Sequence, residues 1–200
     1  MASPSKFDRM KVIKDELLVL KKSPLYSYRI ENKFFPVIGE GSHDAHIMFI
    51  GEAPGLNEAK TGRPFCGRSG NILDELLASI SVSRTSVYVT NIVKDRPPEN
   101  RDPTPEEIRI YGPFLDRQIE IIKPKVLATL GRYSMGYIME HLGLGNVLRP
   151  ISQMHGKSFL ANTSYGEVMI VPLYHPAVAV YNASTKDELK ADFKVLTKYI

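Results

Sequence analysis

The sequence contains a single cysteine, Cys66, among its 200 residues. One cysteine excludes a disulfide framework within the chain, and it excludes a zinc or iron–sulfur site built on several thiolates. Long hydrophobic runs are also missing, because no apolar stretch approaches the ~20 residues that span a bilayer. The charged N-terminal stretch, residues 1–20, lacks the apolar segment of a signal peptide. We therefore expect a soluble, intracellular (cytoplasmic) protein that does not enter a membrane.

The charge balance is only mildly positive. Lys and Arg number 26 against 22 Asp and Glu, which gives a formal net charge of +4. This excess is compatible with a polyanionic partner such as DNA, and it is equally compatible with an ordinary basic protein. Hydrophobic residues make up 43% of the chain. This is enough for one core, so we expect residues 1–200 to form a single domain.

Strand-like and helix-like segments alternate along the chain. Short apolar or β-branched runs predict strands, and apolar residues at helical spacing predict helices. The predicted strands are 46–50, 86–93, 125–130 and 168–174, and the predicted helices are 7–21, 70–80, 105–122, 133–142 and 187–200. The pattern favours an α/β fold, a three-layer sandwich in which helices flank a central, mostly parallel four-stranded sheet.

Polar or glycine-rich residues follow all four predicted strands. Gly51 ends the first strand and Asn91 the second, while Gly131 follows the third and His175 the fourth. Ligands of open α/β sheets bind beyond the carboxyl ends of the strands. The site is therefore expected where these residues meet.

Residues 51–70 hold five glycines and two prolines and lead into a predicted helix. Glycines permit close backbone approach, and the amides at a helix N-terminus bind anions. The spacing is neither GxxxxGK[ST] nor GxGxxG, so this is not one of the common nucleotide-binding loops. A tight turn before a helix is the simpler interpretation of the glycines.

Several side chains around this segment suit chemistry on a flat, polar ring. Glu52 and Glu58 are able to hold a water or stabilise a cationic transition state, although most glutamates are simply solvated. Phe65 either stacks on a base or belongs to the core. Asn91 offers a donor and an acceptor that match a pyrimidine edge, unless it only caps its strand. His175 is placed to donate a hydrogen bond to a developing anion.

Five segments resemble the uracil-DNA glycosylase superfamily, most closely its family 4 or thermostable branch. They are GEAPG (51–55), GRPFCGRSG (62–70), VYVTNIVK (87–94), PFLDRQIEIIKPKVLATLG (113–131) and HPAVAVYN (175–182). The resemblance implies an enzyme that flips uracil out of DNA and hydrolyses its N-glycosidic bond, which starts base excision repair. It also implies DNA containing uracil or a modified base as the partner, and we expect a monomer that associates with the nucleoid through DNA.

The resemblance implies a role for each matching position. Glu52, Glu58 and His175 would be catalytic, with Glu52 the candidate that activates water and His175 the donor to the base O2. The residues at the base would be Gly51, Ala53, Phe65 and Asn91, and those at the DNA would be Gly67, Ser69, Pro176, Tyr181 and Asn182. No lysine stands out as a nucleophile, so a monofunctional glycosylase without lyase activity is expected. A glycosylase for another modified base, and a non-catalytic DNA-binding homologue, remain alternatives.

Two features depart from the family pattern. Four cysteines usually bind a [4Fe–4S] cluster in family 4, and their positions correspond to the neighbourhood of Leu20 and Ser23, then Asp95 and Tyr111. We therefore expect no cofactor and no metal, and we hypothesise that hydrogen bonds and packing of Ser23, Asp95 and Tyr111 replace the cluster. The family also commonly has an arginine where this chain has Tyr181.

Overall fold

The computed structural model describes residues 4–181 and 184–200, and its central element is a six-stranded sheet. The strands lie in the order β1-β3-β2-β4-β6-β5. Their bounds are β1 (Glu40–Gly41), β2 (Ile47–Gly51), β3 (Tyr88–Asn91), β4 (Val126–Leu130), β5 (Phe159–Thr163) and β6 (Gly166–Leu173). The four inner strands are parallel, and β1 and β5 pair with them antiparallel at the two edges.

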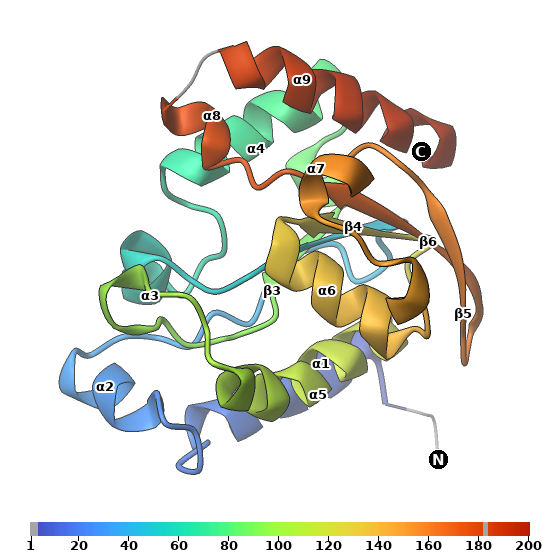
Figure 1. The fold of residues 1–200 in the computed structure, drawn as a ribbon. Helices are drawn as coiled ribbons and strands as arrows, with labels where there is room; N and C mark the ends of the chain where they lie inside the picture. The colour runs from blue at the N-terminus through green and yellow to red at the C-terminus, as the bar shows by residue number, and fades with distance from the viewer. Residues whose placement is uncertain (1–3, 182–183) are drawn as a thin grey trace.

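Helices cover both faces of this sheet (Figure 1). The longer ones are α1 (Lys6–Leu18), α4 (Arg68–Ser79), α5 (Pro105–Ile122), α6 (Arg132–His141) and α9 (Ser184–Phe193). The shorter ones are α2 (Tyr26–Glu31), α3 (Leu56–Thr61), α7 (Ile151–Met154) and α8 (Val178–Tyr181). Helices α1, α5 and α6 pack on one face, and α4 and α9 pack on the other. The expected three-layer α/β architecture is confirmed.

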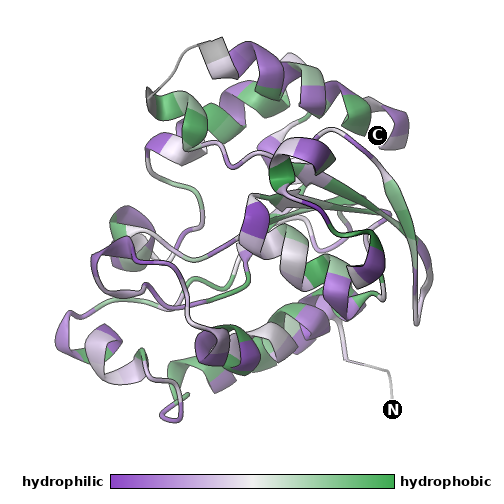
Figure 2. Ribbon diagram, viewed as in Figure 1, coloured by the Kyte–Doolittle hydropathy of each residue, from purple (hydrophilic) through white to green (hydrophobic). Residues whose placement is uncertain are grey.

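Alternating side chains of the strands build two separate cores. Met48 and Ile50 of β2 pack beneath α1, α5 and α6, whereas Ile47 and Phe49 pack beneath α4 and α9. This is the two-residue period of a strand with both faces buried. The helices carry both hydrophobic and hydrophilic residues along their length, as expected for elements with one face on a core (Figure 2).

The two edge strands are the main difference from the sequence prediction, which gave four strands. β1 has only two residues, and β5 has a single buried residue, Ala161, and ends in the polar residues Asn162 and Thr163. Neither segment shows the apolar run or strict alternation that marks a buried strand. Within the described residues, no helix is both long and apolar enough to cross a lipid bilayer.

Candidate active site

The carboxyl ends of the four parallel strands meet at one edge of the sheet, as predicted. Gly51 pairs with Asn91 in the ladder between β2 and β3. On the other side, the amide of Gly131 after β4 donates to the carbonyl of Leu173 at 2.9 Å. A Cβ atom on Gly131 would lie 3.3 Å from the Cβ of His175. The residues that end four separate strands are therefore neighbours in space.

A small cavity of about 170 Å³ lies at this edge. It is lined by Ala53, Gly55, Glu58, Phe65, Ser69, Asn91 and His175. Six of these seven residues belong to the site predicted from the sequence. The cavity is well below the about 300–1,000 Å³ of sites for drug-sized ligands, so its size suits one small ring. A larger cavity of about 530 Å³ beside α1 contains none of the predicted site residues.

Gly51 does not line this cavity, but its lack of a side chain leaves room for two residues that do. A Cβ atom at this position would lie 2.3 Å from Oδ1 of Asn91 and 2.7 Å from Cζ of Phe65. Both distances are shorter than any tolerated contact, so a larger residue would displace both side chains. Gly51 therefore acts on a bound ring through the positions of Asn91 and Phe65.

His175 has a defined protonation state. The amide of Ala177 donates a hydrogen bond to Nδ1 of His175 at 3.1 Å. Burial lowers the pKa of His175 to about 4, so the imidazole is neutral at neutral pH. With Nδ1 accepting, the single ring proton is on Nε2. His175 therefore offers one neutral N–H donor without a net charge.

Phe65 lies beside His175 and is almost completely buried. The two ring centroids are 5.7 Å apart with an interplanar angle of 29°. The backbone of Phe65 has φ +48°, in the left-handed region that bulky residues rarely adopt. A Cβ atom on Gly70 would lie 1.8 Å from the carbonyl oxygen of Phe65, so the following helix approaches this strained residue closely.

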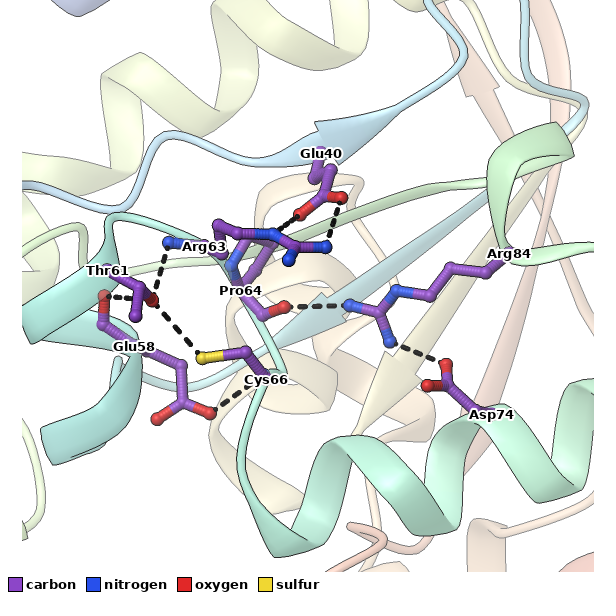
Figure 3. A network of polar contacts seen from close by, with 8 residues as sticks. All are labelled: Glu40, Glu58, Thr61, Arg63, Pro64, Cys66, Asp74 and Arg84. Atoms are coloured by element: carbon purple, nitrogen blue, oxygen red, sulfur yellow. Dashed lines mark hydrogen bonds and ion pairs between the residues drawn. The ribbon is translucent and has the colours of Figure 1, made fainter.

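Glu58 holds the backbone of the loop that carries Phe65. Its Oε1 accepts hydrogen bonds from the amides of Cys66 and Gly67, both at 3.0 Å (Figure 3). Gly67 is the N-cap residue of α4, so its amide is already satisfied by Glu58 rather than free for a phosphate. A catalytic role for Glu58 stays a prediction, but the carboxylate has a clear contact that fixes the loop.

Asn91 is held in place by a lysine that the sequence analysis did not select. The fully buried Lys94 ammonium donates to the Asn91 carbonyl at 2.6 Å, to Thr90 Oγ1 at 2.7 Å and to Gln118 Oε1 at 2.6 Å. Burial lowers the pKa of Lys94 well below its ordinary value. In the described part of the chain, the side-chain amide of Asn91 makes no hydrogen bond, and it faces the cavity. Its donor and acceptor are thus available to a bound ring.

Glu52 follows Gly51 and is not one of the residues that line the cavity. Burial raises the pKa of Glu52 to about 7, and the nearby charge of Asp102 adds to this rise while Arg132 opposes it. Asp102 is itself bound by Arg132 at 2.8 Å and by the Tyr133 hydroxyl at 2.6 Å. A carboxyl with such a pKa is able to take up a proton near neutral pH.

The remaining residues expected to contact DNA differ in whether they lie at the cavity. Ser69 lines the cavity. Pro176 is buried, and its carbonyl accepts the amide of Ala179, which does not favour a direct contact with DNA. Tyr181 ends α8, and Asn182 lies outside the described residues.

Three of the four positions that correspond to the cluster cysteines, Ser23, Asp95 and Tyr111, belong to a buried hydrogen-bonded network, while Leu20 is part of the hydrophobic core. The hydroxyls of Ser23 and Tyr111 are 2.7 Å apart, and Tyr111 donates to Asp95 Oδ2 at 2.5 Å. Arg29 reaches both oxygens of Asp95, at 3.1 and 3.0 Å. The expected hydrogen bonds are therefore present. These side chains supply no thiolate and already satisfy one another, so they do not fit a [4Fe–4S] cluster.

Comparisons with known proteins show the family of this chain. The family model for the Uracil DNA glycosylase superfamily matches residues 38–197. The Type-4 uracil-DNA glycosylase of Sulfurisphaera tokodaii is 44% identical over 94% of this chain and 83% of its own length. Those of Saccharolobus solfataricus and Thermotoga maritima are 40% and 37% identical, over 94% and 88% of this chain and 84% and 86% of their own lengths. With this match over most of its length, the chain belongs to the uracil-DNA glycosylase superfamily.

Proposed function

We propose that this protein is a DNA glycosylase that hydrolyses the N-glycosidic bond of uracil in DNA. The observation that carries the proposal is the cavity that combines the Asn91 amide, the Phe65 ring and the neutral His175 N–H. The aromatic ring suits stacking on a flipped base, and the amide matches the hydrogen-bonding edge of a pyrimidine. The names of the relatives support the same activity.

In the proposed reaction, His175 stabilises the negative charge on the departing base and Glu52 accepts the proton of the attacking water. As the bond between the sugar carbon and the base nitrogen breaks, its electron pair leaves with uracil, and His175 Nε2–H donates to the O2 atom that gains negative charge. Water then adds its oxygen to the cationic sugar carbon, and Glu52 accepts the proton that this water loses. The uracil anion then takes up a proton from solvent and Glu52 releases the proton it accepted, so the net products of adding one water are free uracil and an abasic site.

We infer that the enzyme lacks lyase activity. Cleavage of the strand through a Schiff base requires an amine at the sugar, which a lysine side chain commonly supplies. Lys94 is fully buried and bound to three oxygen acceptors, and the cavity lining in the described part of the chain includes no lysine.

We also infer a monomer that works inside the cell on DNA without an iron–sulfur cluster.

A cleavage assay on labelled oligonucleotides tests the proposed function. The substrates carry uracil in a single strand, opposite guanine and opposite adenine, with hypoxanthine and modified cytosines alongside. We expect a strand break at uracil that appears only after alkali, because a monofunctional enzyme leaves an abasic site. A break at another base alone would show that the substrate is that base rather than uracil. Tight DNA binding without any break would favour the non-catalytic alternative.

The pH dependence of the reaction tests the role of Glu52. If ionised Glu52 accepts the proton of water, the single-turnover rate falls as the pH drops below about 7, because the carboxylate is protonated there. Asp102→Asn removes a charge that raises this pKa, so the acid limb shifts to lower pH. Arg132→Met removes an opposing charge and shifts it to higher pH. An acid limb that moves in neither variant assigns the pH dependence to another group.

A further inference from the structure

The backbone of Phe65 needs support from outside its own loop. A left-handed conformation at a bulky residue persists only where the surrounding structure holds it. Two peptide planes flank this residue. Rotation of the 64–65 plane changes φ of Phe65, and rotation of the 65–66 plane changes its ψ. To fix the ring, the protein must therefore hold both planes.

Figure 3 shows one polar contact on each of these planes. The carboxylate of Glu58 accepts the amide of Cys66 at 3.0 Å, which holds the plane that follows Phe65. The guanidinium of Arg84 donates through Nη2 to the carbonyl of Pro64 at 2.7 Å, which holds the plane that precedes it. The glutamate comes from α3, whereas the arginine comes from the short 3₁₀ helix Arg84–Ser86 after α4.

Arg84 is itself anchored. Its Nη1 donates to Oδ1 of Asp74 in α4 at 2.8 Å, and its side chain is only 22% exposed. Charge-assisted hydrogen bonds in a partly buried setting are stronger than neutral ones. The planar guanidinium contacts the carboxylate and the carbonyl with two nitrogens at once, which a lysine ammonium on a flexible stem does not reproduce.

We propose that Arg84 is a positioning residue of the active site, which fixes the Phe65 ring against the flipped base through the carbonyl of Pro64. Arg84 does not line the cavity, so it acts only through the loop. The role assigned to the base rests on the proposed function. The mechanical role, a restraint on the loop at residues 64–67, does not depend on it.

Arg63 provides a matched control on the same loop. It is an arginine next to Pro64, and its Nε and Nη2 bind Glu40 at 3.0 and 2.9 Å. Its side chain is 65% exposed, and its guanidinium contacts neither peptide plane of Phe65 (Figure 3). Arg63→Met and Arg84→Met thus remove the same charge from nearby places, but only the second removes the restraint.

Hydrogen exchange of residues 62–70 tests the restraint without reference to activity. In Arg84→Met we expect the amides of Cys66 and Gly67 to exchange about tenfold faster, the scale of one lost charge-assisted hydrogen bond. The unfolding midpoint and the exchange of the central strands should stay close to wild type. Arg63→Met should match wild type in residues 62–70. Equal exchange in the two variants would overturn the proposal.

Inhibition by free uracil tests the effect on the base site. We expect Arg84→Met to weaken inhibition about tenfold, Arg84→Lys to give an intermediate loss, and Arg63→Met to stay within twofold of wild type. The decisive comparison repeats Arg84→Met in a Phe65→Ala background. There the arginine should make no further difference, because the ring on which it acts is gone. An equal loss in both backgrounds would overturn the route through Phe65.

The outcomes separate the two proposals. If wild-type protein releases no uracil, the proposed function fails, and the exchange experiment still decides the restraint. If wild-type protein releases uracil while Arg84→Met behaves as Arg63→Met, the positioning role fails. If Arg84→Met does not fold, Asp74→Ala is the second variant. It removes the carboxylate that anchors Arg84, and it lies at an exposed position of a helix. It should raise the exchange of Cys66 and Gly67 in the same direction, and unchanged exchange would again overturn the proposal.

Discussion

Replacing His175 with alanine is expected to lower the single-turnover rate of uracil excision by about 100-fold or more. The ring proton is on Nε2, since Nδ1 accepts the amide of Ala177. A neutral donor in a buried site stabilises the negative charge on the departing base and does not interact as strongly with the neutral base in the ground state. The loss should therefore be in the chemical step rather than in DNA binding.

The measurement is the single-turnover rate at saturating enzyme, together with the affinity for uncleaved DNA. His141→Ala is the control, because His141 is an exposed histidine on α6 that faces Asp116 at 3.6 Å. It should keep wild-type activity. If the His175→Ala variant is folded, binds DNA and retains more than half of the activity, His175 has no role in the mechanism.

Because the pKa of His175 lies near 4, the histidine should not titrate in the range where the enzyme is assayed. This separates it from Glu52, whose pKa of about 7 lies within that range. We therefore expect the acid limb to come from the glutamate, and His175→Ala should lower the rate while leaving the position of this limb unchanged.

Local signals predicted the elements and the location of the site. Thr104, Pro105 and Glu107 mark the start of α5, and the structure contains the complete capping box, in which Thr104 and Glu107 exchange hydrogen bonds at 3.2 and 2.8 Å. Gly51, Asn91 and His175 were predicted to meet because parallel strands bring their carboxyl ends to one edge. Both inferences need only short-range pattern and a general rule of topology.

The supporting residues could not be found in this way. Lys94 closes the VYVTNIVK segment, but lysines are almost always exposed, so the local pattern does not predict that its side chain is fully buried beneath Asn91. Arg84 acts on the carbonyl of Pro64, 20 residues earlier in the chain. The contact depends on the packing of a 3₁₀ helix against a loop, and neither periodicity nor spacing encodes that packing.

Replacing Asp95 with asparagine is expected to lower the free energy of unfolding by about 3–5 kcal/mol. Asp95 and Arg29 are 1% and 3% exposed, so the pair is shielded from water. Asparagine keeps the size of the side chain and removes its charge, which leaves the buried guanidinium without a counter-ion. Arg29 also donates to the carbonyls of Leu17 and Leu18, so the change loosens the end of α1.

Graded variants distinguish the buried ion pair from general sensitivity of the fold. Tyr111→Phe removes one hydrogen bond to Asp95 and should cost about 1–2 kcal/mol. Asp44→Asn breaks the exposed pair with Lys6 and should cost less than about 1 kcal/mol. Arg29→Met combined with Asp95→Asn should be more stable than Asp95→Asn alone, because no unpaired charge remains buried.

Denaturant unfolding of the purified protein, with metal analysis of the same sample, decides whether this network replaces a cluster. Ser23, Asp95 and Tyr111 link the segment before α2, the loop after β3 and helix α5. If they are the support, the protein is colourless and free of iron, and Asp95→Asn destabilises it without releasing any metal. Stoichiometric iron would contradict the replacement. So would an iron-free protein in which Asp95→Asn is no more destabilising than Asp44→Asn, because the three segments would then be held together by apolar packing alone.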